Sequence, residues 1–221
     1  MIYLKYLLFV LYSAFVMSGC SHDMALTKGV DNVDLSSNSI ALLTAKIKNQ
    51  NKPDSKLGLT GTFICPPTET CSSLSSFHEV ESQFNDEDDD FREYLFSFEL
   101  ETGTYNIHAL MSNYLTFFIG AGAKVPLNLK AEIKSNTVTY LGHIDVILRT
   151  KQSDDEERAA LFPLLDAAVA GYSTGTFDVV VEDRFDEDMK LFITEYPGLK
   201  KVKVEKYILP HWVRPEYMND K

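Results

Sequence analysis

Apolar and polar residues alternate over several stretches of this chain, and the alternation restricts the fold more than any other feature. Residues 40–48, 96–101 and 125–132 each show it, and the longest series runs from Val138 to Leu148 in a single phase through Gly142. A repeat of two residues is typical of strands with one buried face. The chain is therefore predicted to be mainly β, an antiparallel sandwich of roughly seven to nine strands.

One helix is predicted near the C-terminus, over residues 183–196. Asp183 is placed to cap its start, and Phe185, Met189 and Phe192 follow at helical spacing. Pro197 and the glycine after it end the pattern. This helix is expected to cover one end of the sandwich.

The chain is long enough for one domain with its own core. We expect the sandwich to occupy residues 36–210, with an acidic loop at 66–90 and a tail at 211–221. Ser135 and Asn136 lie between two alternating runs and are predicted to form a hairpin turn. An α+β chain in two parts, divided at the acidic run that follows residue 150, is the alternative.

The N-terminus has the layout of a secretory signal. Lys5 precedes an apolar run at residues 6–16, which is shorter than the roughly 20 residues needed to cross a bilayer. Ser18-Gly19-Cys20 resembles the lipobox of bacterial lipoproteins, although Met17 replaces the usual leucine. The resemblance implies removal of residues 1–19 and acylation of Cys20.

The residue after Cys20 bears on the compartment. Ser21 stands where an aspartate often retains lipoproteins in the inner membrane, so the pattern resembles that of outer-membrane lipoproteins. The expected location is the outer membrane, facing the periplasm or the exterior. Residues 20–35 are mostly polar and are predicted to form a tether between lipid and fold.

A short motif gives a second resemblance. Gly103-Thr104-Tyr105 resembles the Gly-x-Tyr strand entry of transthyretin-like and carboxypeptidase-regulatory-like β-sandwiches. This resemblance implies a sandwich fold.

Two cysteines remain once Cys20 is assigned to the anchor. Cys65 and Cys71 are separated by five residues, and an oxidising compartment favours a structural disulfide between them. Free thiols and a redox or metal-binding pair are the alternatives. A redox pair usually has two intervening residues.

The formal net charge is −11 at pH 7. Such a charge argues against nucleic-acid binding, which needs concentrated Lys and Arg. It also argues against electrostatic adhesion to anionic lipid, so contact with the membrane is expected to depend on the covalent lipid.

One motif suggests hydrolase chemistry. Gly171-x-Ser173-x-Gly175 matches a nucleophile elbow, and Asp183 and His211 follow in the order of a hydrolase triad. The elbow needs a strand before its serine and a helix after it, whereas the sequence predicts a strand after Ser173. No catalytic residue is therefore assigned.

No metal or cofactor is expected either. The acidic runs, at 86–90 and around Asp183, lack the alternating ligands and central glycine of an EF-hand. His143 and Asp145 share one face of a strand and could pair or supply two legs of a metal site. No glycine-rich phosphate loop follows a strand.

Two aromatic stretches are candidates for a partner surface. Phe117 and Phe118 lead into flexible glycines, and Trp212 lies beside Arg214 in a mixture enriched at interfaces. Core packing is the alternative for both stretches.

These features together favour a non-enzymatic outer-membrane lipoprotein that binds or assembles with another envelope component, with a protein partner expected. A periplasmic carrier of a small molecule or lipid, with its cavity between the sheets, is the second hypothesis. A serine hydrolase centred on Ser173 is the third.

Overall fold

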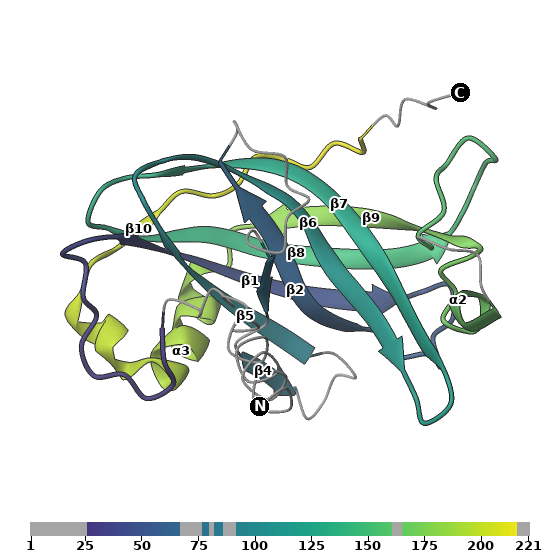
Figure 1. Cartoon of the computed structure of the whole chain (residues 1–221), viewed down its shortest axis with the longest axis horizontal. Coiled ribbons are helices and arrows are strands. Elements are labelled where there is room, and N and C mark those ends of the chain that lie inside the picture. The colour runs from purple at the N-terminus through teal and green to yellow at the C-terminus, as the bar shows by residue number, and fades with distance from the viewer. Residues whose placement is uncertain (1–25, 67–76, 80–81, 86–91, 161–164, 216–221) are drawn as a thin grey trace, which may run out of the picture.

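The computed structural model describes residues 26–66, 77–79, 82–85, 92–160 and 165–215. The protein is mainly β, as predicted (Figure 1). Its strands are β1 (Ser39–Asn49), β2 (Gly58–Cys65), β3 (Phe77–Glu79), β4 (Ser82–Asn85), β5 (Arg92–Leu100), β6 (Gly103–Leu115), β7 (Gly120–Ile133), β8 (Val138–Thr150), β9 (Gly175–Glu182) and β10 (Val204–Lys206). The helices are α2 (Leu165–Val169), α3 (Phe185–Glu195) and the 3₁₀ helix η2 (Pro197–Lys201).

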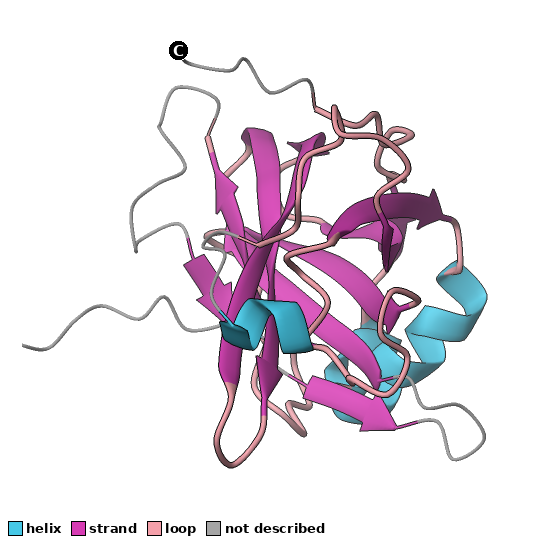
Figure 2. Cartoon of the chain, turned by 90° about the vertical axis from the view of Figure 1, so that its right-hand side faces the viewer, coloured by secondary structure: helices cyan, strands magenta, loops and turns pink. Residues whose placement is uncertain are grey.

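The strands form two sheets. One has the order β4-β5-β1-β8, and both β9 and β10 pair with the far edge of β8. The other has the order β3-β2-β6-β7. Figure 2 shows the strands packed together in the middle of the molecule, with the longer helix at its lower edge.

The main core lies between the sheets. The inward side chains of β1, β5 and β8 meet those of β2, β6 and β7, and Phe96, Phe98, Ile107 and Leu110 are fully buried there. The same core includes Tyr172, Phe177 and Trp212, so the C-terminal part packs into the sandwich rather than forming a separate unit.

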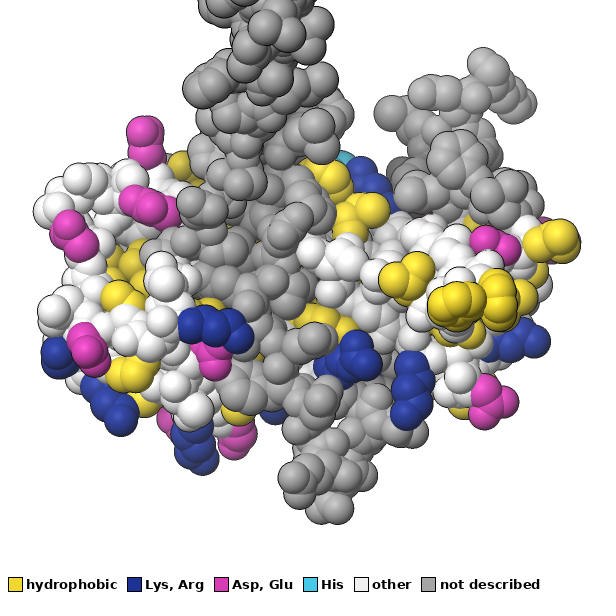
Figure 3. Space-filling view, turned by 60° about the horizontal axis from the view of Figure 1, so that its bottom comes forward, with side chains coloured by type: hydrophobic (Ala, Val, Ile, Leu, Met, Phe, Trp, Pro, Cys, Tyr) yellow, Lys and Arg dark blue, Asp and Glu magenta, His cyan; other side chains and the backbone are white. Residues whose placement is uncertain are grey.

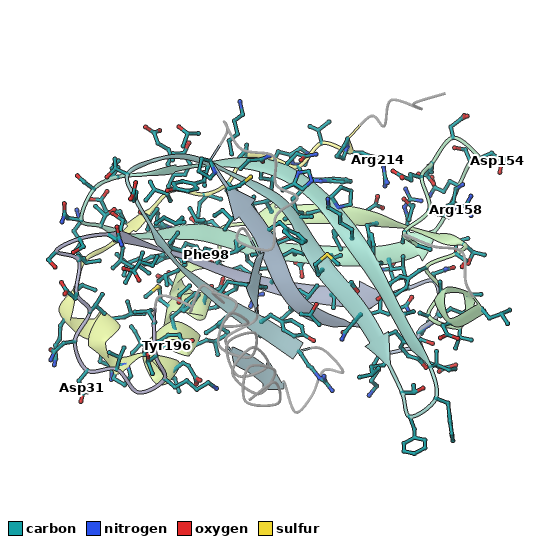
Figure 4. All side chains as sticks on the ribbon, viewed as in Figure 1. Asp31, Phe98, Asp154, Arg158, Tyr196 and Arg214 are labelled. Atoms are coloured by element: carbon teal, nitrogen blue, oxygen red, sulfur yellow. The ribbon has the colours of Figure 1, made fainter. Side chains whose placement is uncertain are left out.

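A second apolar cluster lies on the outer face of the first sheet, under α3. Met189 and Phe192 of the helix pack there with Tyr196, which Figure 4 labels beside α3. Leu26 is buried in this cluster, and Val30, Val33 and Leu35 pack against it. The structure therefore differs from the predicted tether, because residues 26–35 belong to the fold and only the residues before Leu26 are left to link it to Cys20.

Helix α3 confirms the predicted helix with bounds one or two residues shorter. The predicted cap is wrong by one residue, because Arg184 is at the N-cap and makes no side-chain cap bond. Asp183 precedes it, and its carboxylate accepts a hydrogen bond from the Phe185 amide at 3.2 Å. The helix ends before Pro197, as predicted, and Pro197 begins η2, which was not predicted. None of the helices in the described ranges combines the length and the apolar character needed to cross a membrane.

Three strand predictions need correction. Strand β8 runs parallel to β1 and β10, so the first sheet is mixed rather than wholly antiparallel. The turn at Ser135 and Asn136 links β7 of one sheet to β8 of the other, so it is not a hairpin, although Asn136 has the positive φ of a turn residue. Strands β3 and β4 lie within residues 66–90, which were expected to be a loop.

Candidate functional site

A β-bulge at Gly142 decides which side chains of β8 lie under α3. Leu42 pairs with Tyr140 but Thr44 pairs with His143, so β8 carries one extra residue at this point. Gly142 has φ +115°, a backbone conformation that favours glycine. The bulge brings Tyr140 and His143 to the same outer face, whereas Ile144 turns inward. The predicted single phase from Val138 to Leu148 is therefore wrong.

A buried polar cluster fills the space between this face and the first turns of α3. Its members are Thr44 of β1, Glu93 of β5, Tyr140 and His143 of β8, and Asp188 of α3. Asp188 accepts hydrogen bonds from the Tyr140 hydroxyl at 2.5 Å and from the Thr44 hydroxyl, both at Oδ2. Its other oxygen, Oδ1, has no hydrogen-bond partner and lies 3.8 Å from Nη2 of Arg184.

Charged side chains converge on His143. Its Nδ1 lies 3.0 Å from Oε1 of Glu93, an ion-pair distance without hydrogen-bond geometry, and its Nε2 lies 3.2 Å from Asp145. Nη1 of Arg184 is 3.1 Å from the same Nε2. Nζ of Lys46 completes the group at 3.2 Å from Glu93. The predicted pairing of His143 with Asp145 is present, as one contact of a larger cluster.

The cluster changes how its members titrate. Burial raises the pKa of Asp188, and the two hydroxyl hydrogen bonds offset only part of that effect. Burial lowers the pKa of His143, but the hydrogen bond to Asp145 and the ion pair with Glu93 outweigh it, so the pKa is raised. Burial raises the pKa of Glu93, but His143 and Lys46 outweigh it, so the pKa is lowered. The cluster therefore favours a charged His143 next to a charged Glu93.

Ligand atoms of Glu93, His143 and Asp188 lie within 4.8 Å of one another, close enough to hold one metal ion together. However, Arg184 contacts the imidazole and Lys46 contacts Glu93, so positive charge already balances the carboxylates. A divalent ion would have to compete with both cations. The geometry fits an ion-pair cluster that fixes α3 on the sheet better than it fits a metal centre.

An open groove of about 510 Å³ begins at the rim of this cluster. It lies on the outer face of the first sheet, and its lining includes Lys46, Lys48, Asp145, Val180, Glu182 and Arg184. Its lining contains both positive and negative side chains. The groove is therefore outside the sandwich, whereas the carrier hypothesis places its cavity between the sheets.

The most exposed apolar side chains lie at the other end of the molecule, where β6 turns into β7. We call residues 115–120 the β6–β7 tip. Phe117 is 92% exposed, Phe118 88% and Leu115 77%, and the two phenyl rings contact each other edge to face with centroids 4.6 Å apart. Figure 3 shows apolar side chains gathered at this end of the surface. The predicted candidates Phe117 and Phe118 thus face solvent and are not part of the core.

The β6–β7 tip is an ordered turn. The Thr116 amide donates to the Ile119 carbonyl at 2.8 Å, and the Ile119 amide donates to the Thr116 hydroxyl at 3.1 Å. The Gly120 amide donates to Asp166 of α2 at 3.4 Å. On the same helix, Leu165 is 87% exposed, which adds apolar surface beside the tip.

Trp212 and Arg214 do not share this surface. The Trp212 ring is buried in the main core, and its indole N–H donates to the Pro126 carbonyl at 2.9 Å. Arg214 lies over that ring, donates to Thr176 at 2.8 Å and pairs with Asp178. Both residues bind the C-terminal segment to the sandwich, so Trp212 is a core residue.

Ser173 is not part of a catalytic triad with Asp183. Ser173 lies in the turn between α2 and β9, so a helix precedes it and a strand follows, the reverse of a nucleophile elbow. Ser173 precedes the start of β9 and Asp183 follows its end. The eight residues of this strand separate Ser173 from Asp183 by roughly 25 Å. Asp183 pairs instead with Lys206 at 2.6 Å.

Several predicted residues fall outside what the structure describes. Cys20, Cys71 and the acidic run 86–90 lie outside the described ranges. Cys65 is buried at the end of β2. Lipidation at Cys20 and the Cys65–Cys71 disulfide therefore stay predictions.

The chain has no match among protein-family models, curated proteins or solved structures. The resemblances to lipoproteins and to transthyretin-like sandwiches therefore rest on the sequence motifs, and the sites rest on geometry.

Proposed function

We propose that this protein is a non-enzymatic lipoprotein of the outer membrane that acts as an envelope binding or assembly module. Acylated Cys20 is its membrane anchor, and the β6–β7 tip is its binding surface. The domain faces the periplasm or the exterior.

One observation carries the proposal: two adjacent phenylalanines are almost fully exposed at the end of an ordered hairpin. Exposed large side chains scattered singly are normal, but Phe117, Phe118, Leu115 and Leu165 form a group at one end of the molecule. The turn that presents them is closed by its own hydrogen bonds, so the rings are held outside the core. Aromatic side chains held this way are typical anchors of binding surfaces.

The test is crosslinking in the native envelope followed by purification of the lipidated chain. We compare wild type with the Cys20→Ala variant, with the double variant Phe117→Asp/Phe118→Asp, and with Val213→Asp as a matched control at another exposed apolar residue. The proposal expects crosslinked envelope components with wild type and Val213→Asp, and their loss in the other two variants.

Two results would count against the proposal. If Cys20→Ala leaves the chain in the membrane fraction with all its crosslinks, Cys20 is not the anchor. If the double aspartate variant keeps the crosslinks of wild type, the β6–β7 tip is not the binding surface.

A further inference from the structure

We propose that the β6–β7 tip binds the lipid bilayer itself, by inserting its phenylalanines among the acyl chains next to the Cys20 anchor. This inference rests on the proposed function and names the partner of the same surface. It makes the tip a second membrane contact in addition to the covalent lipid.

The first argument is the lack of charged residues in the β6–β7 hairpin near the tip. Residues 102–123 contain no Asp, Glu, Lys or Arg, although charged residues make up 24% of the chain. This stretch includes the whole of β6, the whole tip and the first residues of β7. A charged side chain carried into the hydrocarbon would oppose insertion, and the tip brings none.

The second argument concerns hydrogen bonds. A protein interface usually makes about one hydrogen bond per 100–200 Å² of buried surface. The tip's one hydroxyl, on Thr116, already accepts from the Ile119 amide, and the Thr116 and Gly120 amides also have partners within the molecule. Backbone groups that enter a bilayer must be satisfied internally, which holds for these three amides. Within the described ranges, the structure shows no hydrogen bond for the amides of Phe117 and Phe118, so the backbone of these two residues stays at the interface and only their rings insert. The tip therefore suits a partner that offers no hydrogen bonds, which describes acyl chains better than a protein.

The third argument is the length of the link to the lipid. Leu26 is buried, and its amide donates to the Ser97 hydroxyl at 3.1 Å, so the fold begins there. Residues 20–25 reach at most about 20 Å when fully extended. An acylated Cys20 therefore holds the domain against the bilayer. In both Figure 1 and Figure 2, the tip lies toward the lower side of the molecule, as does α3, on which the segment after Leu26 packs.

The depth of insertion is limited by α2. The carboxylate of Asp166 lies at the base of the tip, bonded to the Gly120 amide. A carboxylate is expected to stay in the headgroup region, so only the exposed side chains of Leu115, Phe117 and Phe118 enter the hydrocarbon. The contact is a shallow wedge and not a transmembrane segment.

The test uses the full, lipidated chain with Phe118→Trp, reconstituted in phosphatidylcholine vesicles with either plain or brominated acyl chains. Bromine quenches an indole only in close contact. The native Trp212 is buried in the core and serves as an internal reference that lipid does not reach. Val213→Trp is the matched control, because Val213 is 75% exposed beside Arg214, which Figure 4 labels at the upper edge, away from the β6–β7 hairpin.

If the tip inserts, the tryptophan fluorescence of Phe118→Trp is lower in brominated vesicles than in plain vesicles. The fluorescence of Val213→Trp is the same in both. Equal emission of Phe118→Trp in the two lipids would overturn the inference. Flotation of the same vesicles separates the two proposals. Phe118→Trp chains that float with the vesicles but are not quenched are anchored without inserting the tip, which overturns this inference and leaves the anchor standing. If Phe118→Trp is quenched equally with and without the Cys20→Ala substitution, the tip inserts but Cys20 is not the anchor.

Discussion

Replacing Asp188 by alanine is the most direct test of the idea that the buried polar cluster holds α3 on the sheet. The substitution removes the acceptor of two buried hydroxyls, those of Thr44 and Tyr140. It also removes a carboxylate that lies 3.8 Å from both His143 and Arg184.

The size of the effect follows from these contacts. A hydrogen bond to a charged group contributes about 1.5–3 kcal/mol, and Asp188 accepts two. The desolvation of the carboxylate, which the substitution relieves, offsets part of that sum. Removing one member of a buried ion pair typically costs about 3–5 kcal/mol, and we expect Asp188→Ala to fall in that range. This is a large part of the roughly 5–15 kcal/mol that stabilises a domain.

The assay is equilibrium unfolding in urea, with Asp186→Ala as the matched control. Asp186 is exposed in the first turn of the same helix, so its loss removes only an interaction with the helix dipole, about 0.3–1 kcal/mol. Asp188→Asn keeps an oxygen acceptor for both hydroxyls and should fall between the two. A difference of less than about 1 kcal/mol between Asp188→Ala and Asp186→Ala would refute the structural role of the cluster.

Two further predictions concern β8. The first is a pH dependence: because contacts with Asp145 and Glu93 raise the pKa of His143 despite its burial, the charged imidazole stabilises the fold. The stability that wild type has over His143→Gln should be complete below about pH 6.5 and should shrink as the pH rises through the raised pKa, in urea titrations between pH 5.5 and 8.5; an advantage that grows with pH would contradict this. The second is Gly142→Ala, which should lower the free energy of unfolding by about 1–3 kcal/mol, because the residue has φ +115° and a Cβ would lie 3.1 Å from the Glu182 carbonyl oxygen. An unchanged urea midpoint for this variant would show that the bulge is not strained by a side chain.

The sequence was sufficient to predict the fold class and the position of α3. Alternation of apolar residues in β5 and β7 reports which face of each strand packs in the main core, and it did so correctly because that core imposes it. In β1 both faces are buried as far as Ala45, because Ile40 and Leu42 pack in the cluster under α3. Likewise, Pro197 and the apolar spacing of α3 are local signals that need no tertiary information. Phe117 and Phe118 were named as surface candidates on composition, but only the structure shows that they are exposed.

The buried polar cluster could not be predicted, for a physical reason. Glu93, His143 and Asp188 are distant in sequence and belong to two strands and a helix, so no local spacing relates them. In each strand they occupy positions that a two-residue repeat assigns to the outer, solvated face. Burial of that face depends on where α3 packs, which is a tertiary property. The bulge at Gly142 was also hidden, because glycine fits either phase of an alternating run.

The two faces of the first sheet explain why a polar cluster is found at this place. The inner face is apolar along its length and packs on the second sheet, whereas the outer face is covered by α3 and η2 only over part of its length. At the edge of the area that α3 covers, the apolar cluster under the helix borders the open groove lined by Lys46, Asp145 and Arg184. A boundary of this kind needs groups that are buried on one side and hydrated on the other, which charged pairs provide. The cluster therefore sets the place where α3 stops covering the sheet. The β6–β7 tip projects from the second sheet, so substitutions there should leave α3 and the cluster unchanged.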